Sequence, residues 1–201
     1  MEGIKAIPLF ASPLISLQVE ENTDELIEYP YEFTKCSADC QTYSTDNQIL
    51  RKFPKIKKIL LSYFIKIAED IFKYDQTFKI STSWVTKTKD TSSQVHRHKN
   101  SFYSGVYYFE DYPNDSGELE FKNPLTAYWD YYVVPKQYNA MNMLSYGERP
   151  KKNKLVFFPS YLEHRVADNN HIGRRSLAFN IVPIGEYGSG DSSYNTSWLS
   201  K

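Results

Sequence analysis

The hydrophobic pattern of this chain changes its period once, close to residue 77, and that change limits the folds that the chain can adopt. Between residues 47 and 74, apolar residues recur three and four positions apart, while lysines and acidic residues lie off that face. This spacing predicts an amphipathic helix packed on the outside of a sheet. From Thr77 to Thr86, apolar and polar residues alternate instead, which predicts a strand.

Short runs rich in aromatic and β-branched residues continue through the rest of the chain and predict further strands. They lie at residues 104–109, 117–121, 154–158, 165–166 and 174–183. An edge strand is also expected at residues 14–19, where prolines mark its approach. One helical segment ahead of many short strands predicts a mostly β protein with a flanking helix, built as a double-stranded β-helix of the jelly-roll, cupin-like type.

Length and composition favour a single domain over residues 1–201. Within it we expect helical support from about residue 47 to 74 and a flexible tail from about residue 185 to 201, where Gly, Ser, Tyr and Asn accumulate. The 24 Lys and Arg residues balance the 24 Asp and Glu residues. This balance weighs against a partner that is held by bulk charge, such as nucleic acid or an anionic membrane.

The sequence contains neither a run of about 20 apolar residues that could span a bilayer nor a recognisable secretory signal. We therefore expect a cytoplasmic protein. The only two cysteines, Cys36 and Cys40, are separated by three residues with no second pair nearby, and we expect them to be free thiols in a reducing compartment.

The segment from Gln94 to Phe109 is the strongest candidate for chemistry. His96 and His98 are two residues apart, so in an extended chain both imidazoles point to one face and can reach one metal ion. The aromatic and β-branched run that follows favours a strand rigid enough to hold ligands. A lone His-x-His pattern is equally compatible with ordinary surface histidines.

A second stretch, residues 154–180, strengthens the metal-site interpretation. An apolar strand ends in Pro-Ser, a loop leads to His164, and ten residues later Arg174 opens another strand. Three of the four histidines in the chain therefore fall at predicted strand edges. Arg174 and Ser176 share one face of their strand, whereas Arg175 points to the other. An ordinary ion pair at a strand edge is the alternative interpretation of the Arg174 segment.

Four motifs occur in order along the chain. They are His-x-His-x-Asn-Ser from His96 running into Ser-Gly-Val-Tyr-Tyr from Ser104, Ser-Gly-x-Leu-x-Phe-x-x-Pro from Ser116, Phe-Phe-Pro-Ser-x-Leu-x-His-x-Val from Phe157, and Arg-x-Ser-x-x-Phe-Asn from Arg174. Together with Pro-Leu-Phe-x-Ser-Pro-Leu from Pro8, they resemble the 2-oxoglutarate and Fe(II)-dependent oxygenases of bacteria and tailed bacteriophages. The resemblance spans residues 8 to about 182.

This resemblance implies a non-haem Fe(II) enzyme that couples oxidative decarboxylation of 2-oxoglutarate to hydroxylation of a substrate, with dioxygen as co-reactant. It implies His96 and His164 as iron ligands. It also implies that Arg174 binds the far carboxylate of 2-oxoglutarate and that Ser176 adds a hydroxyl donor. Candidates for a cosubstrate hydrogen bond from the facing strand are Tyr103, Tyr107 and Tyr108. A bacteriophage source would place the protein in the host cytoplasm.

The third iron ligand is the point at which this chain departs from the usual oxygenase pattern. A carboxylate normally stands two residues after the first histidine, and here that position holds His98. Three interpretations are open: His98 completes a three-histidine site, a carboxylate from elsewhere reaches the metal, or one histidine stays outside the ligand sphere and 2-oxoglutarate completes the site. The candidate carboxylates are Asp90, Glu110, Glu118 and Glu120. The set His96, His98 and His164 is favoured, and His171, in a polar turn, is expected to be solvated.

A jelly-roll barrel does not define a function by itself. The alternative is a cupin-type metal-binding barrel, either a dioxygenase or isomerase independent of 2-oxoglutarate or a non-catalytic ligand-binding protein. Arg174 and Ser176 discriminate between the two, because such barrels need no carboxylate-binding arginine there. The sequence does not identify the primary substrate. The aromatic, irregular residues 123–150 are a candidate lid or substrate-binding wall.

Overall fold

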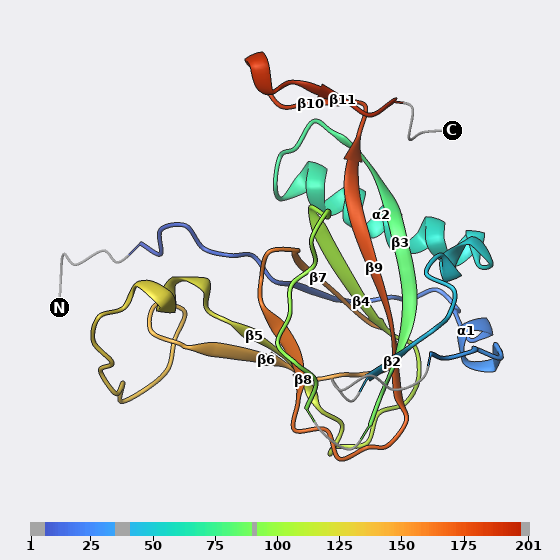
Figure 1. Ribbon diagram of the computed structural model, residues 1–201, viewed down its shortest axis with the longest axis horizontal. Helices are drawn as coiled ribbons and strands as arrows, with labels where there is room; N and C mark the ends of the chain where they lie inside the picture. Colours follow the sequence, from blue (N-terminus) through green and yellow to red (C-terminus); the bar gives the residue numbers. More distant parts are fainter. Residues whose placement is uncertain (1–6, 35–40, 90–91, 198–201) are drawn as a thin grey trace.

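The computed structural model describes residues 7–34, 41–89 and 92–197, and it is built mainly from two antiparallel sheets (Figure 1). The larger sheet has six strands in the spatial order β1 (Ile15–Gln18), β7 (Lys154–Pro159), β4 (Tyr103–Tyr108), β9 (Arg174–Ile184), β3 (Thr77–Thr88) and β2 (Gln41–Tyr43). The smaller sheet has the order β6 (Ser145–Glu148), β5 (Glu118–Lys122) and β8 (His164–Ala167). Both sheets line one cavity, and the predicted mostly β, jelly-roll fold is confirmed.

A short extended segment before β4 continues the smaller sheet beyond β8. His96 and His164 exchange two backbone hydrogen bonds, of 2.9 Å from the His96 N–H and 2.8 Å from the His164 N–H. A further backbone hydrogen bond joins the same two segments, from the Ser93 N–H to the Val166 carbonyl at 2.8 Å. The segment that carries the first two histidines is therefore fixed beside the strand that carries the third.

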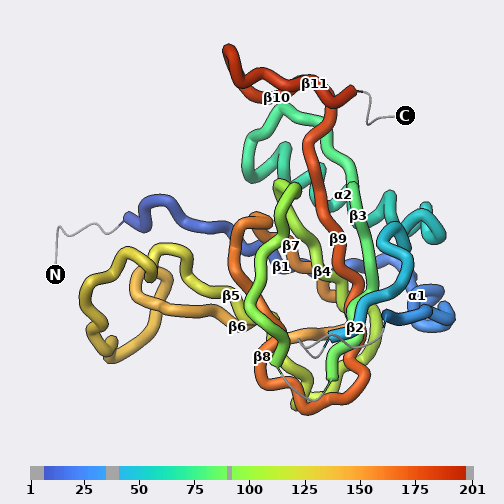
Figure 2. The backbone as a smooth tube through the Cα atoms, viewed as in Figure 1, coloured from blue at the N-terminus to red at the C-terminus, as the bar shows by residue number. Residues whose placement is uncertain are grey.

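Helix α2 (Pro54–Asp70) covers the outer face of the larger sheet (Figures 1 and 2). A 3-10 turn, η1 (Ile49–Arg51), precedes it, so the helical segment expected at residues 47–74 contains two pieces. Pro54 stands at the first helical position, where its missing N–H removes no hydrogen bond. The buried residues recur at helical spacing and are Ile56, Leu60, Phe64, Ile67 and Ala68.

The strands of the larger sheet divide their side chains between the helix and the cavity. On β4, Tyr103 and Tyr107 join the core beneath α2, while Val106 and Tyr108 join the cluster on the cavity side. This is the two-residue alternation that a sheet with both faces covered requires.

Strand β3 breaks this alternation with a shift of register between Ile80 and Thr82. Phe78 and Ile80 lie in the core beneath α2, whereas Trp84 and Thr86 line the cavity. The unbroken alternation predicted for residues 77–86 is therefore wrong at this point. A β-bulge re-aims the side chains that follow it, and here it turns the second half of β3 toward the cavity.

The remaining elements lie at the periphery. They are α1 (Glu25–Glu28), η2 (Pro124–Tyr128), β10 (Glu186–Tyr187), η3 (Gly190–Ser192) and β11 (Tyr194–Asn195). The part of the tail that the structure describes forms a small β10–β11 hairpin. Cys36, Cys40 and Asp90 lie outside the described residues. Among the described helices, none has the length and apolar character needed to cross a bilayer.

Candidate metal and diacid site

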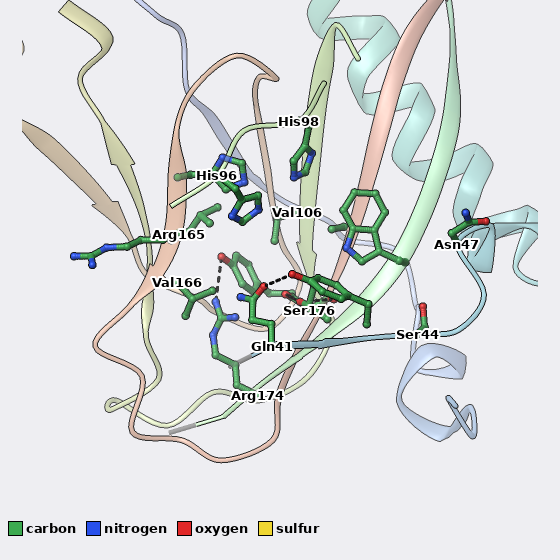
Figure 3. Close-up of a pocket in the computed structure, with 17 residues that line it drawn as sticks. Gln41, Ser44, Asn47, His96, His98, Val106, Arg165, Val166, Arg174 and Ser176 are labelled. Atoms are coloured by element: carbon green, nitrogen blue, oxygen red, sulfur yellow. Dashed lines mark hydrogen bonds between the residues drawn. The ribbon is translucent and has the colours of Figure 1, made fainter. Parts of the chain in front are cut away.

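A cavity of about 360 Å³ lies between the two sheets (Figure 3). Its walls come from β2, β3, β4 and β9 of the larger sheet and from β5 and β8 of the smaller one. His96, His98, His164 and Arg174 all line the cavity. In Figure 3, Arg174 lies below His96 and His98 in the view. Every one of these four residues was singled out from the sequence, and the fold brings all four to one cavity.

The three histidines form the group of side chains that could hold a metal ion. One ring nitrogen from each of His96, His98 and His164 lies within 4.8 Å of the others. The ring centroids are 4.5 Å apart for His96 and His164, 5.0 Å for His98 and His164, and 5.5 Å for His96 and His98. Nitrogens at such separations can converge on one divalent ion, because metal–imidazole bonds are about 2.0–2.1 Å long.

Each of these imidazoles uses Nδ1 for a hydrogen bond to an oxygen. His96 Nδ1 lies 3.0 Å from the Gln94 carbonyl and His164 Nδ1 lies 2.9 Å from the Leu162 carbonyl. His98 Nδ1 lies 2.7 Å from the side-chain oxygen of Asn180 and 2.9 Å from the Ser104 hydroxyl. Because carbonyl and amide oxygens only accept, Nδ1 carries the proton in all three rings. The Nε2 lone pairs are therefore available to a metal, as in metal sites whose ligands are oriented by a second hydrogen bond.

Burial keeps two of the histidines neutral. It lowers the pKa of His98 to about 4, with the Asn180 hydrogen bond acting in the opposite direction and His96 adding a smaller lowering effect. Burial likewise lowers the pKa of His164 to about 3, and the nearby His96 lowers it further. Both rings are thus in the metal-binding form at neutral pH.

Arg174 carries a buried positive charge beside this group. Only 1% of the residue is exposed, and its Nε and Nη1 have no hydrogen-bond partner within the described residues. Its Nη2 donates a long, 3.5 Å hydrogen bond to the Tyr108 hydroxyl, and the guanidinium lies 5.3 Å from the Tyr108 ring centre. Among the described ion pairs, none includes Arg174. A buried guanidinium without an ion-pair partner lowers the stability of the folded protein unless an anion binds to it.

Several hydroxyl groups lie in the part of the cavity that contains Arg174. Ser176 lies on the cavity face of β9 with Arg174, and its Oγ is 2.9 Å from the Thr86 hydroxyl. Tyr108 is fully buried, and this burial raises the pKa of its hydroxyl above the ordinary tyrosine value. The Tyr108 phenol therefore remains a hydrogen-bond donor at neutral pH. These groups suit a ligand that carries a carboxylate.

The structure separates the three tyrosines that were candidates for a cosubstrate contact. Tyr108 lines the cavity. Tyr103 instead packs against Phe64 with ring centroids 5.2 Å apart, and the Tyr107 hydroxyl is 2.6 Å from the Thr23 hydroxyl. Tyr103 and Tyr107 belong to the core on the α2 side of the sheet, so only Tyr108 lies with the site.

Three of the four carboxylates considered as third ligands have arginine partners, and the fourth, Asp90, lies outside the described residues. Glu110 binds the Arg175 side chain at 2.8 Å, Glu118 binds Arg149 at 2.7 Å, and Glu120 binds Arg165 at 2.5 Å. Within the described residues, the metal-ligand group contains no carboxylate. Arg165 lines the cavity wall, but its guanidinium points away from the histidines (Figure 3).

Other cavity residues had no recognised role in the sequence. Gln41 and Tyr43 of β2 contribute an amide and a phenol to the wall and are hydrogen-bonded to each other at 3.3 Å. The pairing of their segment with β3 places both side chains here. Conversely, residues 123–150 do not line the cavity, and most of their large apolar side chains are exposed. His171 also lies outside the metal-ligand group.

Comparison with known proteins identifies a family that matches the part of the chain around this cavity. Residues 82–180 match the family described as "Putative 2OG-Fe(II) oxygenase", where 2OG is 2-oxoglutarate. This range contains all three histidines and Arg174. No curated protein matches the chain in sequence.

Solved structures with a similar fold share little sequence identity with the chain. The alpha-ketoglutarate-dependent epimerase SnoN from nogalamycin biosynthesis has a TM-score of 0.63 at 11% identity, with 89% of this chain and 82% of that chain covered. A prolyl hydroxylase complex from Trichoplax adhaerens gives 0.56 at 11%, covering 83% and 82%. HygX from Streptomyces hygroscopicus, solved with nickel and 2-oxoglutarate, gives 0.55 at 8%, covering 86% and 84%. At such identities the likeness concerns the fold.

Proposed function

This chain carries a 2OG-Fe(II) oxygenase domain at residues 82–180, and from that premise we propose that His96, His98 and His164 hold its iron. We propose further that Arg174, Ser176 and Tyr108 bind 2-oxoglutarate, and that the reaction is hydroxylation of a substrate that is still unidentified. When bound together, iron, 2-oxoglutarate and dioxygen supply oxidative decarboxylation coupled to oxidation of a substrate C–H bond.

The observation that carries the proposal is the buried Arg174. A guanidinium with two unsatisfied nitrogen groups, at a cavity that also holds three neutral imidazoles, is complementary to a small diacid. One carboxylate would meet Arg174, and the opposite end of the diacid would face the histidines. A metal-binding barrel that acts without a diacid has no use for a buried arginine at this place, so Arg174 argues against the cupin-type alternative.

The residues of this chain would prepare the site in three ways. The Nδ1 hydrogen bonds orient the three imidazoles before the metal arrives, which lowers the cost of ordering them. Ser176 and Tyr108 add hydroxyl donors beside the guanidinium. The apolar walls Val106, Leu119 and Val166 exclude water, and exclusion of water strengthens the charge-assisted bonds to the diacid.

The three ligands that we propose are all neutral, whereas the usual oxygenase pattern includes one carboxylate. A neutral ligand set leaves more positive charge on the metal. This should increase the contribution of the dianionic cosubstrate to the stability of the complex. We therefore expect iron and 2-oxoglutarate to bind cooperatively, each raising the affinity for the other.

Anaerobic titration of the purified protein with Fe(II) and 2-oxoglutarate tests the proposal, through the weak visible charge-transfer band of the iron–cosubstrate chelate. We expect the band in the wild-type protein. In Arg174→Ala the 2-oxoglutarate concentration needed for half of the band should rise by at least about 30-fold, because a buried charge pair is lost. His164→Ala should give no band at any cosubstrate concentration.

Arg149→Ala serves as the matched control, since Arg149 is exposed and pairs with Glu118 outside the cavity. It should leave the titration unchanged. A wild-type protein that binds Fe(II) but gives no band with 2-oxoglutarate would overturn the diacid assignment and leave the cupin-type barrel as the better description.

A further inference from the structure

Asn180 lies in a ladder of side chains that crosses three strands of the larger sheet. In the register of the sheet, Asn180 of β9 is opposite Thr82 of β3 on one side and Ser104 of β4 on the other. Its Nδ2 donates to the Thr82 hydroxyl at 3.0 Å, and its Oδ1 accepts from the Ser104 hydroxyl at 3.1 Å. The same Oδ1 is 2.7 Å from His98 Nδ1.

In the structure the ladder directs the Asn180 amide oxygen toward His98, and the Ser104 hydroxyl lies 2.9 Å from the same His98 Nδ1. Ser104 is completely buried, and its hydroxyl is 2.8 Å from that of Ser160, which in turn donates to Ser101 at 2.9 Å. With Nδ2 directed at Thr82, the oxygen of Asn180 faces the imidazole and can only accept a proton from it. The reverse orientation would present an NH₂ group to Nδ1, and the ring would then carry its proton on Nε2 instead.

We propose that Asn180 is the positioning residue that selects the metal-binding tautomer of His98 and so allows a histidine to replace the usual carboxylate ligand. This inference rests on the proposed iron site. A carboxylate needs no such selection, because either oxygen can bind a metal. An imidazole at the same place can bind through Nε2 only when its proton is held on Nδ1. His96 and His164 obtain this from backbone carbonyls, whereas His98 obtains it from a side chain.

The chemical type of the hydrogen-bond acceptor at His98 Nδ1 also affects how strongly the ring donates electrons to a metal. An amide oxygen holds the proton without adding a negative charge, so His98 remains a neutral ligand. A carboxylate in the same place would increase the electron donation of the ring to the metal. Asn180 therefore influences both whether His98 binds and how strongly it donates.

The first experiment measures tautomers in the metal-free protein. Long-range ¹H–¹⁵N NMR at neutral pH distinguishes Nδ1–H from Nε2–H imidazoles, and the four histidines of the chain can be assigned with single His→Gln variants. We expect the Nδ1–H form of His98 in the wild type and in Asn180→Asp. In Asn180→Leu the Ser104 hydroxyl remains beside Nδ1, and because a hydroxyl can donate to the ring as well as accept from it, we expect a mixture of the two forms. Unchanged tautomers in Asn180→Leu would overturn the proposal.

The second experiment measures Co(II) affinity by calorimetry and the visible spectrum of the Co(II) protein. Removal of an oxygen that orients a ligand typically costs about 10–100-fold in metal affinity, and we expect this loss for Asn180→Leu. Asn180→Asp should bind at least as tightly as the wild type, with shifted visible bands, because the carboxylate makes His98 a stronger donor. A purely structural role would not produce this rescue or this spectral shift.

Asn114→Leu is the matched control, since Asn114 is exposed and lies outside the cavity; it should bind Co(II) like the wild type. If Asn180→Leu does not fold, Asn180→Asp decides the matter: a loss of affinity of tenfold or more in that variant would overturn the proposal. Failure of the wild type to bind Co(II) would instead overturn the iron site of the proposed function. The NMR result in the metal-free protein still decides the role of Asn180 separately.

Discussion

At the scale of single residues, charge pairing separates the candidate iron ligands from the candidate carboxylates. Glu118 and Glu120 each form an ion pair with an arginine, whereas Nδ1 of each candidate histidine ligand lies beside uncharged oxygens. A carboxylate that left its arginine to reach a metal would leave an unpaired charge behind. These ion pairs favour His98 over Glu118 and Glu120 as the third ligand.

We therefore predict that Glu120→Gln leaves the Co(II) dissociation constant within about twofold of the wild type. The Arg165–Glu120 pair is partly exposed, so its loss should lower the free energy of unfolding by less than about 1 kcal/mol. Calorimetric titration measures the affinity, and His98→Ala provides the contrast, with a loss of about 10-fold or more. A tenfold loss in Glu120→Gln would identify Glu120 as the third ligand.

Gly105 is a residue whose missing side chain shapes the core. A Cβ at this position would lie 2.3 Å from the ring of Phe179, which is fully buried on the neighbouring strand. We predict that Gly105→Ala lowers the free energy of unfolding by about 1–3 kcal/mol, because the ring cannot move aside in a packed core. Denaturant unfolding measures the change. Ser62→Ala on the exposed side of α2 is the control and should change stability by less than about 0.5 kcal/mol.

At the scale of elements, the periods of hydrophobicity predicted the amphipathic helix and the strands, because burial on one face leaves a regular trace in the sequence. The bulge in β3 left no such trace. Ile80 and Trp84 are both large and apolar, and nothing in the local sequence reports that they face opposite sides of the sheet. The same limit applied to Tyr107 and Tyr108, since adjacent aromatic residues do not reveal which one faces inward.

The contact between α2 and the larger sheet gives a prediction at this scale. Phe64 is fully buried, and its ring lies 5.1 Å from Phe78 and 5.4 Å from Phe157 between ring centroids. Phe64→Ala should lower the free energy of unfolding by about 3–5 kcal/mol, through lost burial and the cavity left behind. Ile71→Ala, at a residue that is 59% exposed just after the helix, should cost less than about 0.5 kcal/mol. Equal effects in denaturant unfolding would contradict the orientation of the helix.

At the scale of the whole molecule, one face of the larger sheet forms the core beneath α2 and the other face lines the cavity. The face beneath α2 is packed with apolar side chains, and the opposite face carries the residues proposed to bind the diacid and the ladder at Asn180. The expectation that His96, His164 and Arg174 meet came from the resemblance to the oxygenases, which rests on short local motifs. The sequence could not predict the bond from Asn180 to His98, since that contact depends on the register between distant strands.

The arm between β5 and β6, residues 124–143, allows a test of whether the two sheets alone form the cosubstrate site. Its strands pair as far as Lys122 with Ser145, and the Asn123 N–H donates to the Leu144 carbonyl at 2.9 Å. Residues 124–143, which connect them, carry exposed aromatic side chains and do not line the cavity. If they act as neither lid nor wall for the cosubstrate, the arm can be shortened without changing the site.

We predict that replacing residues 124–143 with an Asn-Gly turn preserves the hairpin, because a two-residue turn of this type matches the twist of antiparallel strands. The charge-transfer band formed with Fe(II) and 2-oxoglutarate should then appear at the same cosubstrate concentration as in the wild type. The comparison requires a folded variant, which circular dichroism and denaturant unfolding can establish. A band that is lost in a folded variant would show that the arm reaches the cavity in solution. In that case the original expectation of a lid would be restored, and the two sheets alone would not suffice to bind the diacid.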